Sequence, residues 1–188
     1  MNRIIYPLLG LAVFMLVSAF TLVRPPAKGP DYIGAKSCKG CHNTTKGGKT
    51  YAKWEKSAHA NAFKTLKTKE ADKIAKEAGH STPAAETKEC LSCHVTGMLD
   101  AGASFDKKFK KEEGVGCESC HGPGDKYKLK HNTPEKVAKA GKLGMIFPKV
   151  ADGSAEKQCI TCHNKKSPTY KPFKFKEMWA EIEHSLPE

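Results

Sequence analysis

The chain has 188 residues, and its 32 lysines and arginines against 20 aspartates and glutamates give a formal net charge of +12. This length allows one domain or at most two small ones, and a charge of this sign is typical of proteins that bind nucleic acid or membranes. Arginine occurs only at positions 3 and 24, so the sequence has no arginine-rich patch and we expect no nucleic-acid partner.

The first 26 residues differ from the rest of the chain. Arg3 precedes an apolar run over residues 4–23, which two prolines follow. A basic start before an apolar segment is typical of an export signal, and a weak cleavage site follows Ala19. The run also has about the 20 residues that span a bilayer. Residues 1–26 are therefore either a signal peptide or an N-terminal membrane anchor, and residues 27–188 form one domain in the periplasm or on the outer face of the cytoplasmic membrane.

In that domain, cysteine is the most informative residue type. Eight cysteines form four pairs, and in each pair two residues separate the cysteines and a histidine follows at once. The four motifs are Cys38, Cys41 and His42; Cys90, Cys93 and His94; Cys117, Cys120 and His121; and Cys159, Cys162 and His163. Two thiols at this spacing reach the two vinyl groups on one edge of a haem, and the histidine that follows ligates its iron. The motifs therefore predict four covalently attached c-type haems.

Three other interpretations of the cysteines agree less well with this spacing. An even number of cysteines in an exported chain would ordinarily predict disulfides, zinc ribbons need no histidine after each pair, and a redox dithiol needs one pair only. With 8 histidines in 188 residues, a histidine follows all four pairs by chance with odds of roughly a few in a million. Four haems also bring about eight propionate charges, so the holoprotein is only mildly basic.

Four histidines remain outside the motifs, and their number equals the number of sixth coordination positions on four irons. These candidate distal ligands are His59, His80, His131 and His184. Methionine is the competing axial ligand, since it is common in single-haem cytochromes. The candidate methionines are Met98, Met145 and Met178. The four spare histidines make methionine ligation unnecessary.

The first two candidates belong to one predicted helix and the turn after it. Residues 51–78 predict a helix that ends at the capping Gly79. His59 shares an apolar face of this helix with Phe63, which is also the pattern of an ordinary core histidine, but four haems in need of ligands favour ligation. His80 follows the capping glycine in a turn, which either aims the side chain at an iron or exposes it to water.

The last two candidates flank the other predicted helices. His131 comes shortly before Thr133, which has the character of an N-cap for a helix over residues 134–140. His184 follows a predicted helix over residues 173–182. The apolar stripe of that helix consists of Phe175, Trp179, Ile182 and Leu186. His184 points away from this stripe, so either the helix ends first, or His184 serves a haem on its other side or in a neighbouring subunit.

The predicted fold class follows from the balance of elements. Helix signals dominate, including a further segment over residues 83–93, and no convincing alternating strand occurs. The short gap between the second and third motifs indicates that their two haems lie close together. Four haems leave roughly forty residues each, too few for a large protein core. We therefore expect a mostly α fold with extensive loops and little or no β, in which four stacked haems form the core.

Four segments carry a resemblance to a known family. They are residues 32–42, 54–66, 89–97 and 114–124, and the resemblance covers most of residues 32–163. Together they resemble the multihaem cytochromes of the cytochrome c-554 type. The resemblance implies a mostly helical fold around stacked and perpendicular haem pairs and a periplasmic electron-transfer role. It also implies that His59 and His131 are distal ligands. Some members keep one haem five-coordinate, and related proteins polymerise into filaments.

The leading functional hypothesis is a periplasmic electron carrier with four bis-histidine haems and no catalytic residues. Its partners would be other redox proteins or a membrane quinol-oxidising complex. The first alternative is a haem enzyme that converts a small nitrogen compound or peroxide at one five-coordinate haem. The second is a homo-oligomeric subunit of an extracellular haem filament. The matching number of histidines favours the carrier and the filament over the enzyme.

Overall fold

The computed structural model describes residues 29–184. The predicted signal peptide or anchor, residues 1–26, lies outside this range. Within the described part, no helix is both long enough and apolar enough to cross a membrane.

The described chain is mostly helical with very little β structure, which confirms the predicted fold class. The α-helices are α1 (Lys39–His42), α2 (Thr50–Glu55), α3 (Ala62–Thr65), α4 (Lys69–Glu77), α5 (Lys88–His94), α6 (Glu118–His121), α7 (Pro134–Ala140), α8 (Ser154–Cys159) and α9 (Phe175–Ile182). Short 3-10 helices lie at η1 (Ala35–Cys38), η2 (His59–Asn61), η3 (Lys111–Glu113) and η4 (Gly141–Leu143). The strands β1 (Asp31–Tyr32) and β2 (Ser104–Phe105) form one parallel pair, in which Asp31 is opposite Ser104.

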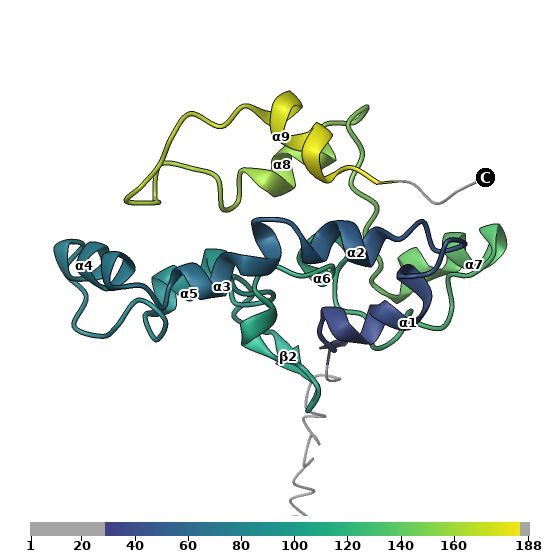
Figure 1. The fold of residues 1–188 in the computed structure, drawn as a ribbon. Coiled ribbons are helices and arrows are strands. Elements are labelled where there is room, and N and C mark those ends of the chain that lie inside the picture. The colour runs from purple at the N-terminus through teal and green to yellow at the C-terminus, as the bar shows by residue number, and fades with distance from the viewer. Residues whose placement is uncertain (1–28, 185–188) are drawn as a thin grey trace, which may run out of the picture.

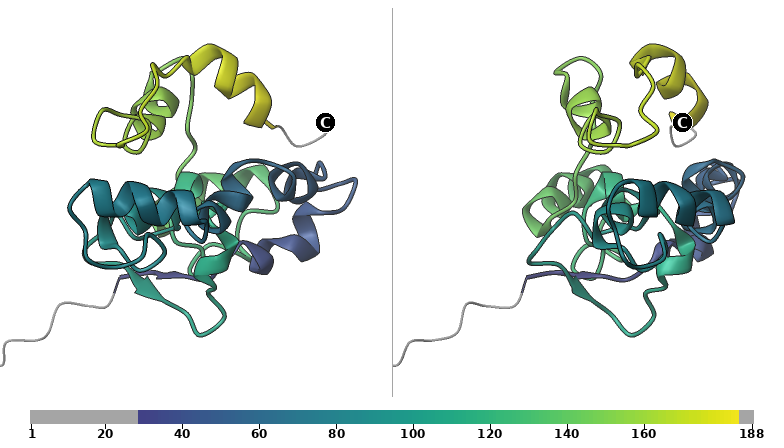
Figure 2. Two further views of the ribbon diagram at one scale, coloured as in Figure 1. Left: turned by 60° about the vertical axis from the view of Figure 1, so that its left-hand side comes forward. Right: turned by 90° about the vertical axis from the view of Figure 1, so that its left-hand side faces the viewer.

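The helices lie in two layers (Figure 1). In the lower layer of that view, α1 and α7 lie at one end, α4 and α5 lie at the opposite end, and α6 lies between them. The helices α8 and α9, with the long loops beside them, form the upper layer, and the turned views show the same separation (Figure 2). The four motifs are thereby distributed along both layers.

The predicted helix over residues 51–78 is not continuous, because the structure divides it into α2, η2, α3 and α4. At the first break, the backbone N–H of Val115 donates to the carbonyl of His59 at 3.0 Å, so a distant segment takes up an oxygen that a longer helix would use. At the second break, the hydroxyl of Thr68 accepts from the N–H of Ala71 at 3.1 Å and caps α4.

Gly79 ends α4 as predicted. Its φ is +87°, its N–H donates to the carbonyl of Lys76 at 3.0 Å, and the N–H of His80 donates to the carbonyl of Ala75 at 3.0 Å. This pair of hydrogen bonds is the Schellman motif, in which glycine adopts the left-handed conformation at little energetic cost. The motif directs the chain, and His80 with it, away from the axis of α4.

The three other predicted helices are present, but their observed ends agree with the predicted ends to different degrees. The helix over residues 134–140 coincides with α7, and the hydroxyl of Thr133 accepts from the N–H of Lys136 at 3.4 Å. The helix over residues 83–93 is shorter than predicted, since α5 begins only at Lys88. The helix α9 ends at Ile182, so the first of the two alternatives for His184 is confirmed and this histidine follows the helix.

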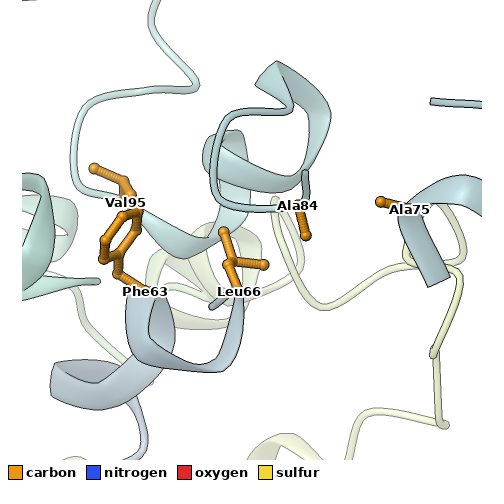
Figure 3. Close-up of a cluster of buried hydrophobic side chains, with 5 residues drawn as sticks. All are labelled: Phe63, Leu66, Ala75, Ala84 and Val95. Carbon is orange, nitrogen blue, oxygen red and sulfur yellow. The ribbon is translucent and has the colours of Figure 1, made fainter. Parts of the chain in front are cut away.

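The protein's own apolar core is small. It consists of Phe63, Leu66, Ala75, Ala84 and Val95, contributed by α3, α4, the loop before α5 and the residue after it. Phe63 faces Val95, and Leu66 points toward Ala84 (Figure 3). Among residues 29–184, Phe63 is the only large side chain that is less than 2% exposed. Such a small core agrees with the expectation that bound haems supply much of the interior.

Candidate haem attachment sites

Each motif occupies the end of a short helix. The helices α1, α5 and α6 end at the motif histidine, and α8 ends at Cys159, whose carbonyl accepts from the N–H of His163 at 3.0 Å. One helical turn places two residues three positions apart on the same side of a helix. All eight cysteines are free thiols, so the disulfide interpretation is wrong. Local helix formation therefore presents two thiols and one imidazole together at each motif.

The first motif histidine faces one of the candidate distal histidines. The Nε2 atoms of His42 and His131 lie 3.4 Å apart, their ring centroids are 5.7 Å apart, and the ring planes differ by only 8°. The Nδ1 atom of His131 donates to the carbonyl of Tyr127 at 2.9 Å. Because a carbonyl can only accept, the neutral ring of His131 has its proton on Nδ1, and its Nε2 atom then has a lone pair that faces His42.

The ring centroids of this pair have about the spacing of two imidazoles on one metal ion, while their Nε2 atoms lie somewhat closer together than such a pair requires. A metal–imidazole bond is about 2.0–2.1 Å long, so two opposed imidazoles need Nε2 atoms about 4 Å apart and ring centroids roughly 6 Å apart. Burial lowers the pKa of His42, which keeps its ring neutral and available as a ligand. The hydroxyl of Thr50 lies 3.4 Å from the Nδ1 atom of His42 and occupies the side away from His131.

Two further pairs have the same spacing with crossed rings. The ring centroids of His59 and His163 are 6.1 Å apart with planes at 64°, and those of His121 and His184 are 5.9 Å apart at 63°. The Nδ1 atom of His121 donates to the carbonyl of Ile146 at 3.0 Å, and that of His184 donates to a carbonyl at 3.0 Å. In the neutral rings of His121 and His184, these bonds place the proton on Nδ1 and leave the lone pair on Nε2.

The environment of these two pairs also favours the neutral rings. Burial lowers the pKa of His59, His121 and His163, because a charged ring loses hydration inside the protein. The ring of His163 stacks on Phe173, with centroids 4.5 Å apart and planes at 20°. The orientation of each imidazole is thus fixed by a carbonyl, by an aromatic ring or by its facing partner.

The second motif differs from the other three. The Nδ1 atom of His94 donates to the carbonyl of Ala62 at 2.8 Å, so its neutral ring also has the lone pair on Nε2. His80, the fourth candidate distal ligand, lies beside Glu89 of α5, with 3.8 Å between its Nδ1 atom and the carboxylate. Within residues 29–184, no ring contact joins His80 to another histidine. The assignment of His80 as an iron ligand therefore stays a prediction.

Contacts between cysteines order the four attachment sites. Cys38 and Cys117 lie close enough for each thiol to shift the pKa of the other, and the same is true of Cys93 and Cys162. The first site thus adjoins the third, and the second adjoins the fourth. The third and fourth are joined by Gln158, whose side-chain amide donates to the carbonyls of Ser119 and Cys120 at 2.8 and 3.1 Å. These contacts place the sites in the order first, third, fourth, second.

The second and third motifs are also close, although their thiols are not the ones in contact. The hydroxyl of Thr96 accepts from the N–H of Gly116 at 2.7 Å and from the hydroxyl of Ser119 at 3.0 Å. This threonine is buried and ties the segment after the second motif to the start of the third. The closeness expected from the short gap in sequence is therefore present in the backbone.

Comparison with known proteins agrees with this arrangement. The profile of the family described as "Cytochrome c554 and c-prime" matches residues 37–122, which contain the first three motifs. Cytochrome c-554 of Nitrosomonas europaea is 32% identical over 164 residues, an alignment that covers 83% of this chain and 66% of that relative. The chain belongs to the cytochrome c554 family. No solved structure matches it.

The cytochrome c554 family consists of c-type haem proteins, so the free thiols and facing imidazoles of this cytochrome have a defined chemical use. Thioether bonds to the cysteines would fix each haem at one edge, and the motif histidine would hold its iron from one side. The chain spans about two thirds of the length of the curated relative, 66%. The family match covers the attachment sites at α1, α5 and α6.

Sequence reasoning missed one buried acid that holds the third site in place. Glu118 lies between the two cysteines of the third motif and is only 2% exposed. Its carboxylate accepts from the backbone N–H groups of Ile33, Gly34 and Gly124, at 2.9, 2.8 and 2.7 Å. Burial raises the pKa of Glu118, and these three N–H groups oppose that rise. The signal in the sequence was an acid inside a motif that a Gly-Pro-Gly turn follows.

Tyr127 is a second residue that sequence reasoning missed. Its hydroxyl donates to the carbonyls of His121 and Gly122, which lie 3.0 and 2.7 Å away, while its own carbonyl accepts from His131. Its ring meets that of His131 edge-on, with centroids 5.7 Å apart. Tyr127 therefore connects the imidazole that faces the first motif with the backbone of the third.

Proposed function

We propose that this cytochrome is an exported tetrahaem electron carrier. The observation that carries the proposal is that six of the eight histidines form three facing pairs, each with one motif histidine and one from elsewhere in the chain. The proposed ligand pairs are His42 with His131, His163 with His59, and His121 with His184. Two opposed imidazoles close both axial positions of an iron, which is suited to electron transfer rather than to substrate binding.

The contribution of the chain is to hold the ligands in one arrangement. Hydrogen bonds from Nδ1 to backbone carbonyls fix the tautomers of His94, His121 and His131. A ligand that is already oriented needs little rearrangement when the charge beside it changes, and its basicity is set by the group that accepts its other proton. The haems, when bound, would supply one-electron oxidation and reduction at their irons.

The order of the sites supports a role in conduction. The first site lies at α1 and the second at α5, which occupy opposite ends of the lower layer (Figure 1). The third and fourth sites lie between them in the order of contacts, through α6 and α8. A row of redox sites with two separate ends is suited to transfer between two partners. We propose that these are redox proteins or a membrane quinol-oxidising complex outside the cytoplasm.

The haem content of the purified protein tests this proposal. The pyridine haemochrome assay should give about four haems per chain that survive denaturation, and serine in place of both cysteines of one motif should remove one haem. The oxidised protein should show mainly low-spin absorption, because three sites have two imidazoles. Fewer than four haems, or high-spin absorption at most sites, would overturn the proposal.

A second candidate function is supported at the second site only. His94 has no histidine opposite it among the described residues, and His80 lies beside Glu89 instead. An iron with one protein ligand has a position for a small molecule such as carbon monoxide or nitric oxide. Carbon monoxide should bind one haem of the reduced protein if this site is open. Turnover of hydroxylamine, nitric oxide or peroxide at that haem would favour an enzyme over a carrier.

A further inference from the structure

The segment around α7 carries a concentration of positive charge. Residues 126–142 contain six lysines and a single acid, Glu135. Four of these lysines, together with Leu143, line a surface cavity of about 380 Å³ that we name the lysine basin. Its lysines are Lys130, Lys136, Lys139 and Lys142.

The charges of the basin are available to a partner. All four lysines are exposed, and no salt bridge within residues 29–184 involves any of them. The ammonium group of Lys136 donates to the amide oxygen of Asn132 at 3.2 Å, a contact that leaves its charge uncompensated. Leu129, beside Lys130, is 79% exposed and adds an apolar contact next to the basin. Lysines around exposed leucine are suited to a surface that carries acids around an apolar centre.

The basin lies next to one end of the row of attachment sites. Lys130 immediately precedes His131, whose ring faces His42 of the first motif, and α7 begins three residues after His131. In the ribbon, α7 and α1 lie together at the end of the lower layer opposite to α5 (Figure 1). A partner seated on the basin would therefore approach the end of the row at which the first site lies.

We propose that the lysine basin is the docking surface for an acidic redox protein that exchanges electrons with the first site. The proposal rests on the proposed carrier function. It adds the surface through which electrons enter or leave the protein, which we call the port, and the charge of the partner. Facing charges of opposite sign steer two proteins into contact and raise their association rate. A carboxylate rim around the partner's cofactor would meet the lysines, and Leu129 and Leu143 would contact the apolar centre of that rim.

Two other occupants are less well matched to the basin. The propionates of the first haem carry two charges, which is fewer than the four lysines present. An anionic membrane would engage any exposed lysine-rich face, whereas the basin gathers four lysines around one cavity beside the first site. The acidic protein is the occupant that uses both the charge and the position of the basin.

Charge reversal in the holoprotein tests the proposal. The test variant combines Lys136→Glu, Lys139→Glu and Lys142→Glu, and the matched control combines three exposed lysines of α4, Lys69→Glu, Lys73→Glu and Lys76→Glu. Both have the same net charge, but the control residues lie at the opposite end of the molecule (Figure 1). The probe is a flavodoxin, an acidic one-electron protein, and the readouts are calorimetric binding and the second-order rate of electron transfer.

At low ionic strength the α7 variant should lose flavodoxin binding and react at least about tenfold more slowly, while the α4 variant should stay close to the wild type. The difference should disappear at high salt, because salt screens exposed charges. Equal effects of the two variants, or unchanged flavodoxin binding in the α7 variant, would overturn the proposal. So would an α7 variant that lost only its binding to phosphatidylserine vesicles.

Failure of the docking proposal would be distinguishable from failure of the carrier function. Haem content, absorption spectrum and reduction by dithionite do not involve the basin and should be unchanged in both variants. If these properties are normal and flavodoxin discriminates between the variants as described, the port is at α7. If they are normal and it does not discriminate, the cytochrome carries electrons through another surface.

Discussion

The rings of His42 and His131 are almost parallel, at 8°, whereas the rings of the two other facing pairs cross at 63° and 64°. The difference arises from the supports of each ring. His131 is held by the carbonyl of Tyr127, four residues earlier on the same segment, while His184 is held by the carbonyl of Ile182, the last residue of α9. The proposed sites therefore form two electronic classes.

Electron paramagnetic resonance should separate these classes. Parallel imidazole planes split the two iron d orbitals that they overlap, whereas crossed planes leave those orbitals close in energy. The first site should therefore give a rhombic low-spin signal, and the third and fourth sites should give strongly anisotropic ones. The His131→Ala variant should lose the rhombic signal alone. Loss of an anisotropic signal in that variant would contradict the pairing.

Removal of a distal histidine should open one site. In each of the variants His59→Ala, His131→Ala and His184→Ala, one iron would lose its second imidazole, become high-spin and gain a position for carbon monoxide. The high-spin fraction, measured by absorption and magnetic resonance, should rise by about one haem in four for each variant.

The variant His80→Ala tests the second site separately, since His80 lies beside Glu89 and faces no other histidine among the described residues. This variant should keep the spin states of the wild type. A new high-spin haem in His80→Ala would assign His80 to the second site and make all four sites bis-histidine.

Gly114 should be intolerant of a side chain. Its φ is +67°, and a Cβ atom there would lie 2.6 Å from the carbonyl oxygen of His59 and 3.2 Å from that of Ala60. Gly114→Ala should lower the free energy of unfolding by about 1–3 kcal/mol and, by displacing His59, produce a high-spin fraction at the fourth site. Gly102→Ala, where the nearest atom would be 3.4 Å away, is the control for denaturant unfolding and spectra.

Glu118 should be required for the third site to keep its place. In Glu118→Ala three buried N–H groups lose their acceptor, and in Glu118→Gln an amide NH₂ replaces an accepting oxygen and faces donors. A buried group left without its partner costs about 1–3 kcal/mol, so alanine should be the more harmful change. The exposed Glu112→Gln is the control. Equal stability of Glu118→Ala and Glu112→Gln in urea would contradict the role of this carboxylate.

Local signals were sufficient where a structure depends on neighbouring residues. The caps at Thr133 and Gly79 define their helix ends by hydrogen bonds within a few residues, and both were predicted correctly. The break at His59 depends on Val115, a residue far along the chain, so no periodicity within residues 51–78 reveals it.

The candidate sites could likewise be predicted only in their local features. The motifs indicated the chemistry, and the number of histidines indicated the candidates, but not which would meet. His42 and His131 are 89 positions apart, and only the completed fold brings them together. The ends of the row of sites likewise depend on tertiary contacts such as that between Cys93 and Cys162. The short sequence distance between the second and third motifs predicted that their backbones lie close together, and the hydrogen bonds of Thr96 join them. It could not predict which cysteines of different motifs lie close together.

The position of His184 also has a consequence for the maturation of an exported chain. Under the proposed pairing, His59 precedes its partner His163, so the fourth site has both imidazoles once its own motif has crossed the membrane. His121 must wait for His184, which follows all four motifs. The third site would then be the last to gain its second imidazole. If haem is attached during export, the iron of that site would for a time have a position open to small ligands.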